Sequence, residues 1–263
     1  PTVAEFENLI SMKFNRKYGV AVSNGSVALD LALQQLNLKE NDEVILPSFT
    51  IISALSAVVR TGARPVFCDV NKKSWNMTKA DIEKVYTKNT KAVIMVHTYG
   101  LPAEASEIFD FCKANKLTLI EDAAEAHGQK ENNMLCGSFG DMSTFSFYAN
   151  KHITTGEGGI VLTDDEEFYK NLKQMRNLDF ENSKRFNHDN FYWNYRLSGL
   201  QAALGISQLN KLEKTIKLKI NQGKFYLELL SDHQEFFELP QSKFQGVENH
   251  FWVFGVVVKK DNI

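Results

Sequence analysis

The sequence of 263 residues is poor in cysteine and proline and carries no marked excess of charge. Its three cysteines, Cys68, Cys112 and Cys136, are widely spaced and form no CxxC pair, so a disulfide framework and a cysteine zinc site are both poor fits. The 30 basic and 32 acidic side chains leave a net charge of −2, which is not the basic field that nucleic-acid binding requires. We therefore expect a protein of a reducing cytoplasm without a nucleic-acid partner.

Other signals are also missing. No apolar run approaches the roughly 18 residues of a membrane helix, and the first residues lack the basic and apolar regions of an export signal. The six histidines form no HExxH motif, and we expect no metal site. A P-loop, a GxGxxG fingerprint and a GxSxG elbow are absent as well.

Strand-like apolar runs alternate with amphipathic helical stretches through most of the chain. The predicted strands are 19–23, 43–47, a run ending at 70, 92–97, 117–122, 143–147 and 159–163. Thr78 and Asp81 form a capping-box pattern that opens one of the helices between them. This alternation predicts an α/β fold with a mostly parallel sheet sandwiched by helices, in which ligands bind beyond the carboxyl ends of the strands.

The character of the sequence changes after Leu197. Residues 196–230 are predicted to form one long helix or two abutting helices, and residues 251–258 a new strand. We expect a large domain over residues 1–205, followed by a connector helix and the beginning of a small C-terminal α+β domain over 206–263. One strand cannot close a core, so we expect the chain to be truncated.

Two segments at predicted strand ends carry candidate functional groups. The segment 23–33 opens a helix directly after a strand, where free N–H groups and the Ser26 hydroxyl favour a phosphate; a plain turn with a helix cap is the alternative. The segment 117–128 ends its strand on Glu121 and Asp122. Such a carboxylate either caps the next helix or pairs with a cation, for example a protonated ring nitrogen.

Two further segments complete the set. Lys151 follows a predicted strand and precedes a GEGG loop, and a lysine in such a place can act as a Schiff-base nucleophile where the neutral amine is favoured. Ser146 offers another hydroxyl to an anion, and Asn194 and Arg196 lie among aromatic residues before the long helix. With the other signals absent, these residues favour a lysine-centred cofactor chemistry.

Seven motifs that contain these segments resemble the DegT/DnrJ/EryC1/StrS family of pyridoxal-phosphate sugar aminotransferases. In order, over about residues 20 to 205, they are SNGSVAL, EVILPSFT, ARPVFCDV, VHTYG, IEDAAEAHG, GSFGDMSTFSFYANKHITTGEGG and NYRLSGLQAALG. The resemblance implies the PLP-dependent transferase fold type I, which is aspartate aminotransferase-like, with pyridoxal 5′-phosphate bound in the large domain. It also implies that the N-terminal segment of the family is missing before Pro1.

The resemblance assigns roles position by position. Lys151 matches the lysine that binds the cofactor covalently, and Asp122 the aspartate that pairs with its pyridine nitrogen. Cofactor-binding positions are also implied for Gly25, Ser26, Ile51, Glu125, Ser146 and Asn194. Asn194 matches an asparagine that reaches the cofactor phosphate of a neighbouring subunit, which implies a homodimer with shared active sites.

Several positions depart from the family pattern. Ile51 replaces an aromatic residue that commonly stacks on the cofactor ring, and Glu125 replaces a glutamine near its phenolic oxygen, where a carboxylate must be protonated or turned aside. His152 follows the lysine where threonine is common, and we expect a local hydrogen bond rather than a substrate contact. For His97 we expect a structural hydrogen bond rather than catalysis.

The implied reaction transfers an amino group from glutamate to a nucleotide-linked keto sugar. The phrases WNMTKADIE, STFSFYANK and ITTGEGG look most like members that aminate C4 of a GDP-linked 4-keto-6-deoxy sugar. A UDP- or dTDP-linked 4-keto-6-deoxyglucose, and amination at C3, remain alternatives. Lys151 argues against a 3-dehydratase, where histidine replaces the lysine, and no cysteine has the activating context of a desulfurase. A non-catalytic regulator or scaffold on this fold is the alternative from another class.

Overall fold

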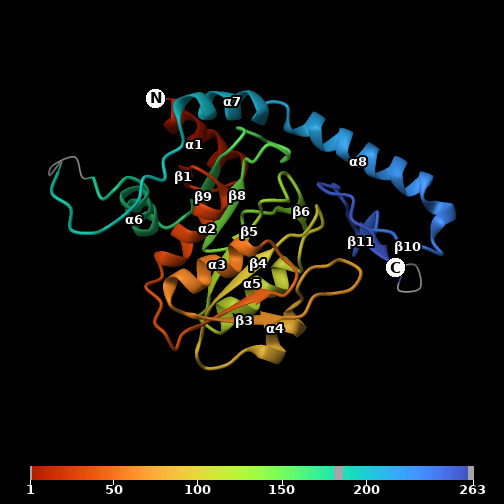
Figure 1. Cartoon of the computed structure of the whole chain (residues 1–263), viewed down its shortest axis with the longest axis horizontal. Coiled ribbons are helices and arrows are strands. Elements are labelled where there is room, and N and C mark those ends of the chain that lie inside the picture. The colour runs from red at the N-terminus through yellow and green to blue at the C-terminus, as the bar shows by residue number, and fades with distance from the viewer. Residues whose placement is uncertain (1, 181–185, 260–263) are drawn as a thin grey trace.

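A seven-stranded sheet lies at the centre of the computed structural model, which describes residues 2–180 and 186–259 (Figure 1). Its strands are β1 (Tyr18–Val22), β2 (Glu43–Pro47), β3 (Arg64–Cys68), β4 (Thr90–Val96), β5 (Thr118–Asp122), β8 (Met142–Ser146) and β9 (Gly159–Thr163). Their order across the sheet is β1-β9-β8-β5-β4-β2-β3. The strands from β3 to β8 pair in parallel, and β9 runs antiparallel to both of its neighbours. The predicted mostly parallel sheet is therefore confirmed.

Helices cover both faces of this sheet. On one face lie α2 (Gly25–Gln34), α3 (Ile52–Thr61) and α6 (Glu166–Arg176); on the other lie α1 (Thr2–Lys13), α4 (Lys79–Val85) and α5 (Ala105–Ala114). Strand β2 shows why: Val44 and Leu46 pack into the first layer, while Ile45 packs into the second. A strand whose successive side chains enter two buried layers reads as a continuous apolar run, which is typical of parallel sheets.

The helix starts follow local capping rules. Asn24 caps α2, and its side chain accepts a hydrogen bond of 2.9 Å from the Val27 N–H. Thr78 caps α4 as predicted, and its hydroxyl accepts a bond of 3.2 Å from the Asp81 N–H. The Asp81 carboxylate accepts a bond from the Thr78 hydroxyl, so it supports the cap from the side-chain end.

Two abutting helices begin the C-terminal part. Helix α7 (Gly199–Leu209) ends just before α8 (Leu212–Leu229), and Figure 1 shows both running along one side of the domain. They are followed by η1 (Ser231–His233) and two small sheets, β10 (Phe237–Glu238) with β13 (Val257–Val258) and β11 (Lys243–Phe244) with β12 (Val247–Glu248). A further small hairpin pairs β6 (Lys130–Glu131) with β7 (Met134–Leu135).

The predicted strand over residues 251–258 is wrong, because only Val257–Val258 form one. Phe251 has a φ of +48°, a left-handed conformation that turns the backbone out of an extended path. The division of the chain at residue 205 stays a prediction. The three cysteines are free and buried. None of the described helices combines the length and the apolar character that a bilayer crossing requires.

Candidate active site

A cavity of about 540 Å³ lies where the parallel strands end. Its walls come from the segments that follow β1, β2, β5 and β8, from the end of β4, and from Trp252 in the C-terminal part. The cavity brings together most of the predicted site residues: Gly25, Ser26, Ile51, Asp122, Glu125, Ser146 and Lys151. The cavity thus lies where the carboxyl-end rule for parallel sheets predicts a ligand site.

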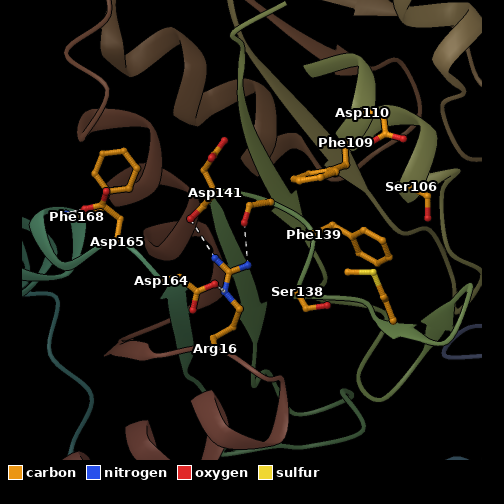
Figure 2. Close-up of a pocket in the computed structure, with 12 residues that line it drawn as sticks. Arg16, Ser106, Phe109, Asp110, Ser138, Phe139, Asp141, Asp164, Asp165 and Phe168 are labelled. Carbon is orange, nitrogen blue, oxygen red and sulfur yellow. Dashed lines mark hydrogen bonds and ion pairs between the residues drawn. The ribbon is translucent and has the colours of Figure 1, made fainter. Parts of the chain in front are cut away.

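A second hollow, of about 630 Å³, lies at the opposite, amino edge of the sheet, and Figure 2 shows its lining. Arg16 reaches into it, donating hydrogen bonds of 2.8 Å to the Gly140 carbonyl and 3.1 Å to the Asp141 carbonyl. The Arg16 Nε atom lies 3.2 Å from an Asp164 carboxylate oxygen. These contacts tie the start of β8 to the end of β9, which is a structural role.

The start of α2 forms a cup suited to an anion. A Cβ added to Gly25 would lie only 2.8 Å from the Ser146 Cβ, so only glycine lets the helix end approach the end of β8 this closely. The Ser26 and Ser53 hydroxyl oxygens lie 2.6 Å apart, one from each of two neighbouring helix starts. Free helical N–H groups and three hydroxyls in one cup match the needs of a phosphate.

The adjacent carboxylates Glu121 and Asp122 have separate roles. Glu121 is fully buried beside His97, whose Nε2 atom lies 2.8 Å from its carboxylate. Its oxygens also accept backbone N–H bonds from Gly137, Phe139 and Gly140. Burial would raise the pKa of Glu121, but these donors outweigh it and hold the pKa below its usual value. Glu121 thus anchors the loop before β8 and lies outside the cavity lining.

Asp122 faces the cavity with bonding capacity to spare. Its carboxylate accepts a bond of 3.1 Å from the Ala124 N–H. Burial raises the pKa of Asp122 above its ordinary value, and the nearby Lys151 charge opposes this rise only in part. A cation placed against the carboxylate would remove this cost. A protonated pyridine nitrogen is such a cation.

Lys151 lies in the same cavity, with 9% of its side chain exposed. Burial lowers the pKa of its amine, while Glu125 and Asp122 act in the opposite direction. The Lys151 Nζ atom lies 4.0 Å from Glu125 Oε1. A buried amine with a lowered pKa is what a Schiff-base lysine needs.

Glu125 meets the condition that the sequence sets for it. Burial raises its pKa to about 7, although Lys151 and the Tyr99 N–H act against that rise. The Tyr99 N–H donates to Oε2 over 2.9 Å, which fixes the orientation of this carboxyl group. A substantial fraction of Glu125 is thus protonated at neutral pH, when it can donate a hydrogen bond as glutamine does.

Two hydroxyls support the fit of pyridoxal phosphate to this cavity. Thr50 Oγ1 is a buried cavity-wall atom with no hydrogen-bond partner within residues 2–180 and 186–259, and the Thr144 hydroxyl is buried in the same wall, where it helps to lower the pKa of Asp122. Buried hydroxyls are normally paired, so the free capacity of the Thr50 hydroxyl points to a site for a polar ligand. An anion cup, a buried acid, a buried amine and these hydroxyls together match the phosphate, ring and aldehyde of that cofactor.

Three residues from the sequence analysis lie outside the cavity lining. Asn194 is exposed, and its Oδ1 accepts a bond of 3.4 Å from the Arg196 N–H, so its role toward a second subunit stays a prediction. The structural hydrogen bond expected for His97 is confirmed by its contact with Glu121, and its Nδ1 accepts a bond of 3.0 Å from the Ala103 N–H.

His152 behaves differently from both expectations. Its ring is buried against His127 at 6.0 Å between centroids, and it does not line the cavity. Neither ring nitrogen has a hydrogen-bond partner among the described residues, so the expected local bond is not present there. Burial, followed by the neighbouring cations, lowers the pKa of His152 to about 3, which keeps the ring neutral.

Sequence reasoning missed several cavity residues. Thr50 and Ser53 follow the end of β2, so the carboxyl-end rule contains the signal that would have found them. Trp252 lies about 100 residues beyond Lys151 in the sequence, and no local pattern indicates that it reaches the cavity.

Comparison with known proteins gives a match over nearly the whole chain. The model of the DegT/DnrJ/EryC1/StrS aminotransferase family matches residues 1–262. GDP-perosamine synthase of Escherichia coli O157:H7 is 41% identical over 224 residues, which are 85% of this chain and 62% of that protein. GDP-perosamine synthase of Vibrio cholerae is 35% identical over 262 residues, 98% of this chain and 70% of that protein. The chain thus spans about two thirds of the length of these relatives.

Solved structures confirm the predicted fold type I. E. coli GDP-4-keto-6-deoxy-D-mannose-3-dehydratase with bound hydrated PLP has a TM-score of 0.90 at 29% identity, covering 99% of this chain and 72% of that chain.

Other relatives are named for different sugars. A dTDP-4-dehydro-2,3,6-trideoxy-D-glucose 4-aminotransferase of Saccharopolyspora spinosa is 37% identical over 81% of this chain and 58% of that protein. A UDP-N-acetyl-3-dehydro-alpha-D-glucosamine 3-aminotransferase of Acidithiobacillus ferrooxidans is 42% identical over 71% of this chain and 50% of that protein.

Proposed function

Because the chain belongs to the DegT/DnrJ/EryC1/StrS aminotransferase family, we propose that it transfers an amino group from glutamate to the keto carbon of a nucleotide-linked sugar. Its cofactor is pyridoxal 5′-phosphate, which is bound in a solved relative. The observation that carries the proposal is that Lys151 and Asp122 line one cavity together with an anion cup. A non-catalytic scaffold has no use for that combination.

Our first choice of substrate is GDP-4-keto-6-deoxymannose, aminated at C4 to give GDP-perosamine. Its support is the similarity to two GDP-perosamine synthases over most of this chain. A UDP- or dTDP-linked 4-keto-6-deoxyglucose, or amination at C3, is the second candidate, because relatives named for dTDP- and UDP-linked sugars have comparable identity over somewhat less of the chain.

The anion cup supplies binding that is remote from the reacting bond. Gly25 brings the start of α2 against β8, so helical N–H groups and the hydroxyls of Ser26, Ser53 and Ser146 surround the same point. A phosphate held there fixes the position of everything attached to it. Asn194 of a second subunit would add an amide to the same cup.

Asp122 controls the charge at the pyridine nitrogen of the cofactor. When bound, the cofactor supplies an electron sink for the carbon from which a proton is removed. The Asp122 carboxylate holds a proton on the ring nitrogen, because an ionised acid in a buried place strongly favours a neighbouring cation. The Ala124 N–H fixes the orientation of this carboxylate.

Lys151 provides the covalent attachment and then the base. Once free, its Nζ atom removes the proton from the α-carbon of glutamate and, in the second half-reaction, delivers a proton to the sugar carbon that receives the amine. Burial favours the neutral amine that the first task requires. Glu125, 4.0 Å away, stabilises the ammonium form that the second task requires.

A second copy of the chain is proposed to complete the site. Large apolar side chains are exposed beside the cavity and near Asn194: Ile51 (58%), Ile52 (64%), Tyr148 (48%), Phe191 (104%) and Trp193 (66%). An exposed apolar surface of this kind around a polar pocket is typical of a protein–protein contact. A homodimer with shared active sites accounts for both the surface and the position of Asn194.

A panel of keto-sugar nucleotides with glutamate tests the reaction. We expect the intact protein to aminate the GDP-linked 4-keto-6-deoxy sugar fastest, with the product identified by mass and by NMR. Faster turnover of a UDP- or dTDP-linked sugar, or an amine at C3, would establish the second candidate. A protein that neither binds pyridoxal phosphate nor transfers an amine would be a scaffold.

Mixing an inactive variant with a weakened one tests the shared site, because the mixture should exceed the average activity of the two variants measured alone. Lys151→Ala removes the amine from one subunit, and Asn194→Ala removes the phosphate contact that it would donate to the other. In an equal mixture about half of the dimers are mixed, and one of their two sites carries both intact residues, so about a quarter of all sites should regain wild-type activity. No recovery on mixing, with dimers confirmed by light scattering, would contradict the shared site.

A further inference from the structure

The amine of Lys151 lies against the face of Trp252. The Nζ atom is 3.4 Å from the centre of the indole ring, which is well within the range of a cation–π contact. Trp252 is 9% exposed and lines the same cavity as Lys151. Its ring is therefore a desolvated partner for the ammonium group, and such contacts are stronger than those on the surface.

Trp252 is held in this place by direct bonds to the large domain. Its indole N–H donates a bond of 3.0 Å to the carbonyl oxygen of Asn150, the residue that precedes Lys151. The indole edge and the indole face thus contact consecutive residues of one loop. Tyr99 also packs against Trp252, with 6.0 Å between the ring centroids.

The backbone around Trp252 is clamped as well. Gly100 has a φ of +101°, and a Cβ at this position would lie 2.7 Å from the Phe251 nitrogen and 3.0 Å from the Trp252 nitrogen. The Gly100 carbonyl accepts a bond of 3.2 Å from the His250 N–H. Gln129 donates to the Glu248 carbonyl over 2.9 Å. The segment that carries Trp252 is thus fixed against the two loops that follow β4 and β5.

The charges around Lys151 come from several elements. Asp122 at the end of β5 and Glu125 in the following loop favour the ammonium form. His127 and His152 lie behind the lysine, and burial keeps both rings neutral by lowering their pKa values. Burial of the amine itself favours the neutral form. The negative face of the indole acts together with the two carboxylates.

We propose that Trp252 is a positioning residue for Lys151, whose free ammonium group it holds against the cavity wall through the face of its indole ring. The amine loses its proton before it joins the cofactor, and it returns to this face whenever it is free and carries a proton. The inference rests on the proposed function, because it takes Lys151 as the residue that binds pyridoxal phosphate.

The test is the pH dependence of cofactor capture by the cofactor-free protein. Only a neutral amine attacks the aldehyde, so the rate of appearance of the lysine-bound visible band rises with pH through the pKa of Lys151. Trp252→Leu keeps an apolar side chain but removes the ring, and we expect the midpoint of this rise to fall by about one pH unit. Trp252→Phe keeps a ring face, so its midpoint should lie between those of the wild type and Trp252→Leu.

Trp75→Leu is the matched control. Trp75 belongs to the same aromatic cluster, 5.6 Å from Tyr99, but it does not line the cavity. The same substitution there should leave the midpoint unchanged. An unchanged or raised midpoint in Trp252→Leu, or an equal shift in Trp75→Leu, would overturn the proposal. If Trp252→Leu does not fold, the proposal is overturned by a midpoint in Trp252→Phe that equals the wild-type value.

These outcomes are separate from those for the proposed function. A protein that captures the cofactor with the expected shifts but aminates no sugar would overturn the function and leave the role of Trp252 standing. A protein that aminates a sugar, but whose midpoint of cofactor capture is the same with and without the Trp252 ring, would support the function and overturn the role of Trp252.

Discussion

The two edges of the central sheet each carry a hollow of similar size, and only the hollow at the carboxyl edge is the candidate active site. The hollow at the amino edge measures about 630 Å³ and that at the carboxyl edge about 540 Å³. At the amino edge, Arg16 uses its guanidinium on two carbonyls and one carboxylate (Figure 2). At the carboxyl edge, Lys151, Asp122 and the Ser26 hydroxyl face one cavity. The carboxyl edge differs from the amino edge by its combination of a buried amine, a buried acid and an anion cup in one cavity, and not by its volume.

The largest effect is expected at the carboxyl edge, from Lys151→Ala. The variant loses both the covalent attachment and the base, so amino transfer should fall by at least about ten-thousandfold. Because alanine leaves only a small gap in a cavity wall, the thermal midpoint of unfolding should change little. Activity is measured with glutamate and the preferred sugar, and unfolding by calorimetry. Transfer at the wild-type rate would refute the assignment of Lys151.

The opposite pattern is expected at the amino edge, from Arg16→Met. Methionine fills the space of the side chain but leaves the Gly140 and Asp141 carbonyls without their donors. The free energy of unfolding should fall by about 3 kcal/mol, as denaturant titration would show. Cofactor capture by the folded fraction should be unaffected. A loss of capture at unchanged stability would mean that the two edges do not differ as described.

A smaller effect is expected from Glu125→Gln, and it depends on pH. The folded-state pKa of Glu125 is raised to about 7 from 4.5, so folding takes up a proton between these values. This stabilisation is complete below the lower pKa and is lost as the pH rises through the upper one. In the cofactor-free variant, the drop in unfolding free energy between about pH 5 and pH 8 should shrink by about 2 kcal/mol. Equal drops in both proteins would mean that Glu125 is ionised throughout.

The smallest effect is expected from Ser53→Ala in the anion cup. Its hydroxyl contributes one hydrogen bond, which corresponds to about a fivefold weaker affinity for pyridoxal phosphate. Pyridoxal, which lacks the phosphate, is the control ligand, and its affinity should stay the same. Equal losses for both ligands would place Ser53 near the ring rather than at the phosphate.

Local sequence patterns predicted most of the sheet, because a strand buried on both faces must be apolar throughout. The strand 159–163 agrees with β9 at both ends. Helices α1 and α6 were not predicted, although Asp165 gives α6 a clear cap by accepting a bond from the Phe168 N–H. Helix α6 is mostly polar, so it shows only a narrow apolar stripe.

The sequence predicted only those parts of the candidate site that follow directly on a strand of the central sheet. Asp122 ends β5 and Lys151 lies in the loop that follows β8, and the family resemblance gave them their roles. The expected strand at 251–258 failed because tertiary contacts decide that segment: Gly100 and Gln129 bind its backbone, and Phe251 adopts a left-handed conformation. The same contacts bring Trp252 to Lys151, and no local pattern contains such information.

The alternation of β5 has a practical consequence for anyone who redesigns this protein. Glu121 points into the layer behind the sheet, where it holds the loop at residues 137–140, and Asp122 points to the cavity. Glu121 therefore has a structural role on one face of the strand, and Asp122 sets the charge of the cavity on the other face. A substitution at position 122 can therefore change the charge of the cavity while the hydrogen bonds of Glu121 to the loop at residues 137–140 stay intact.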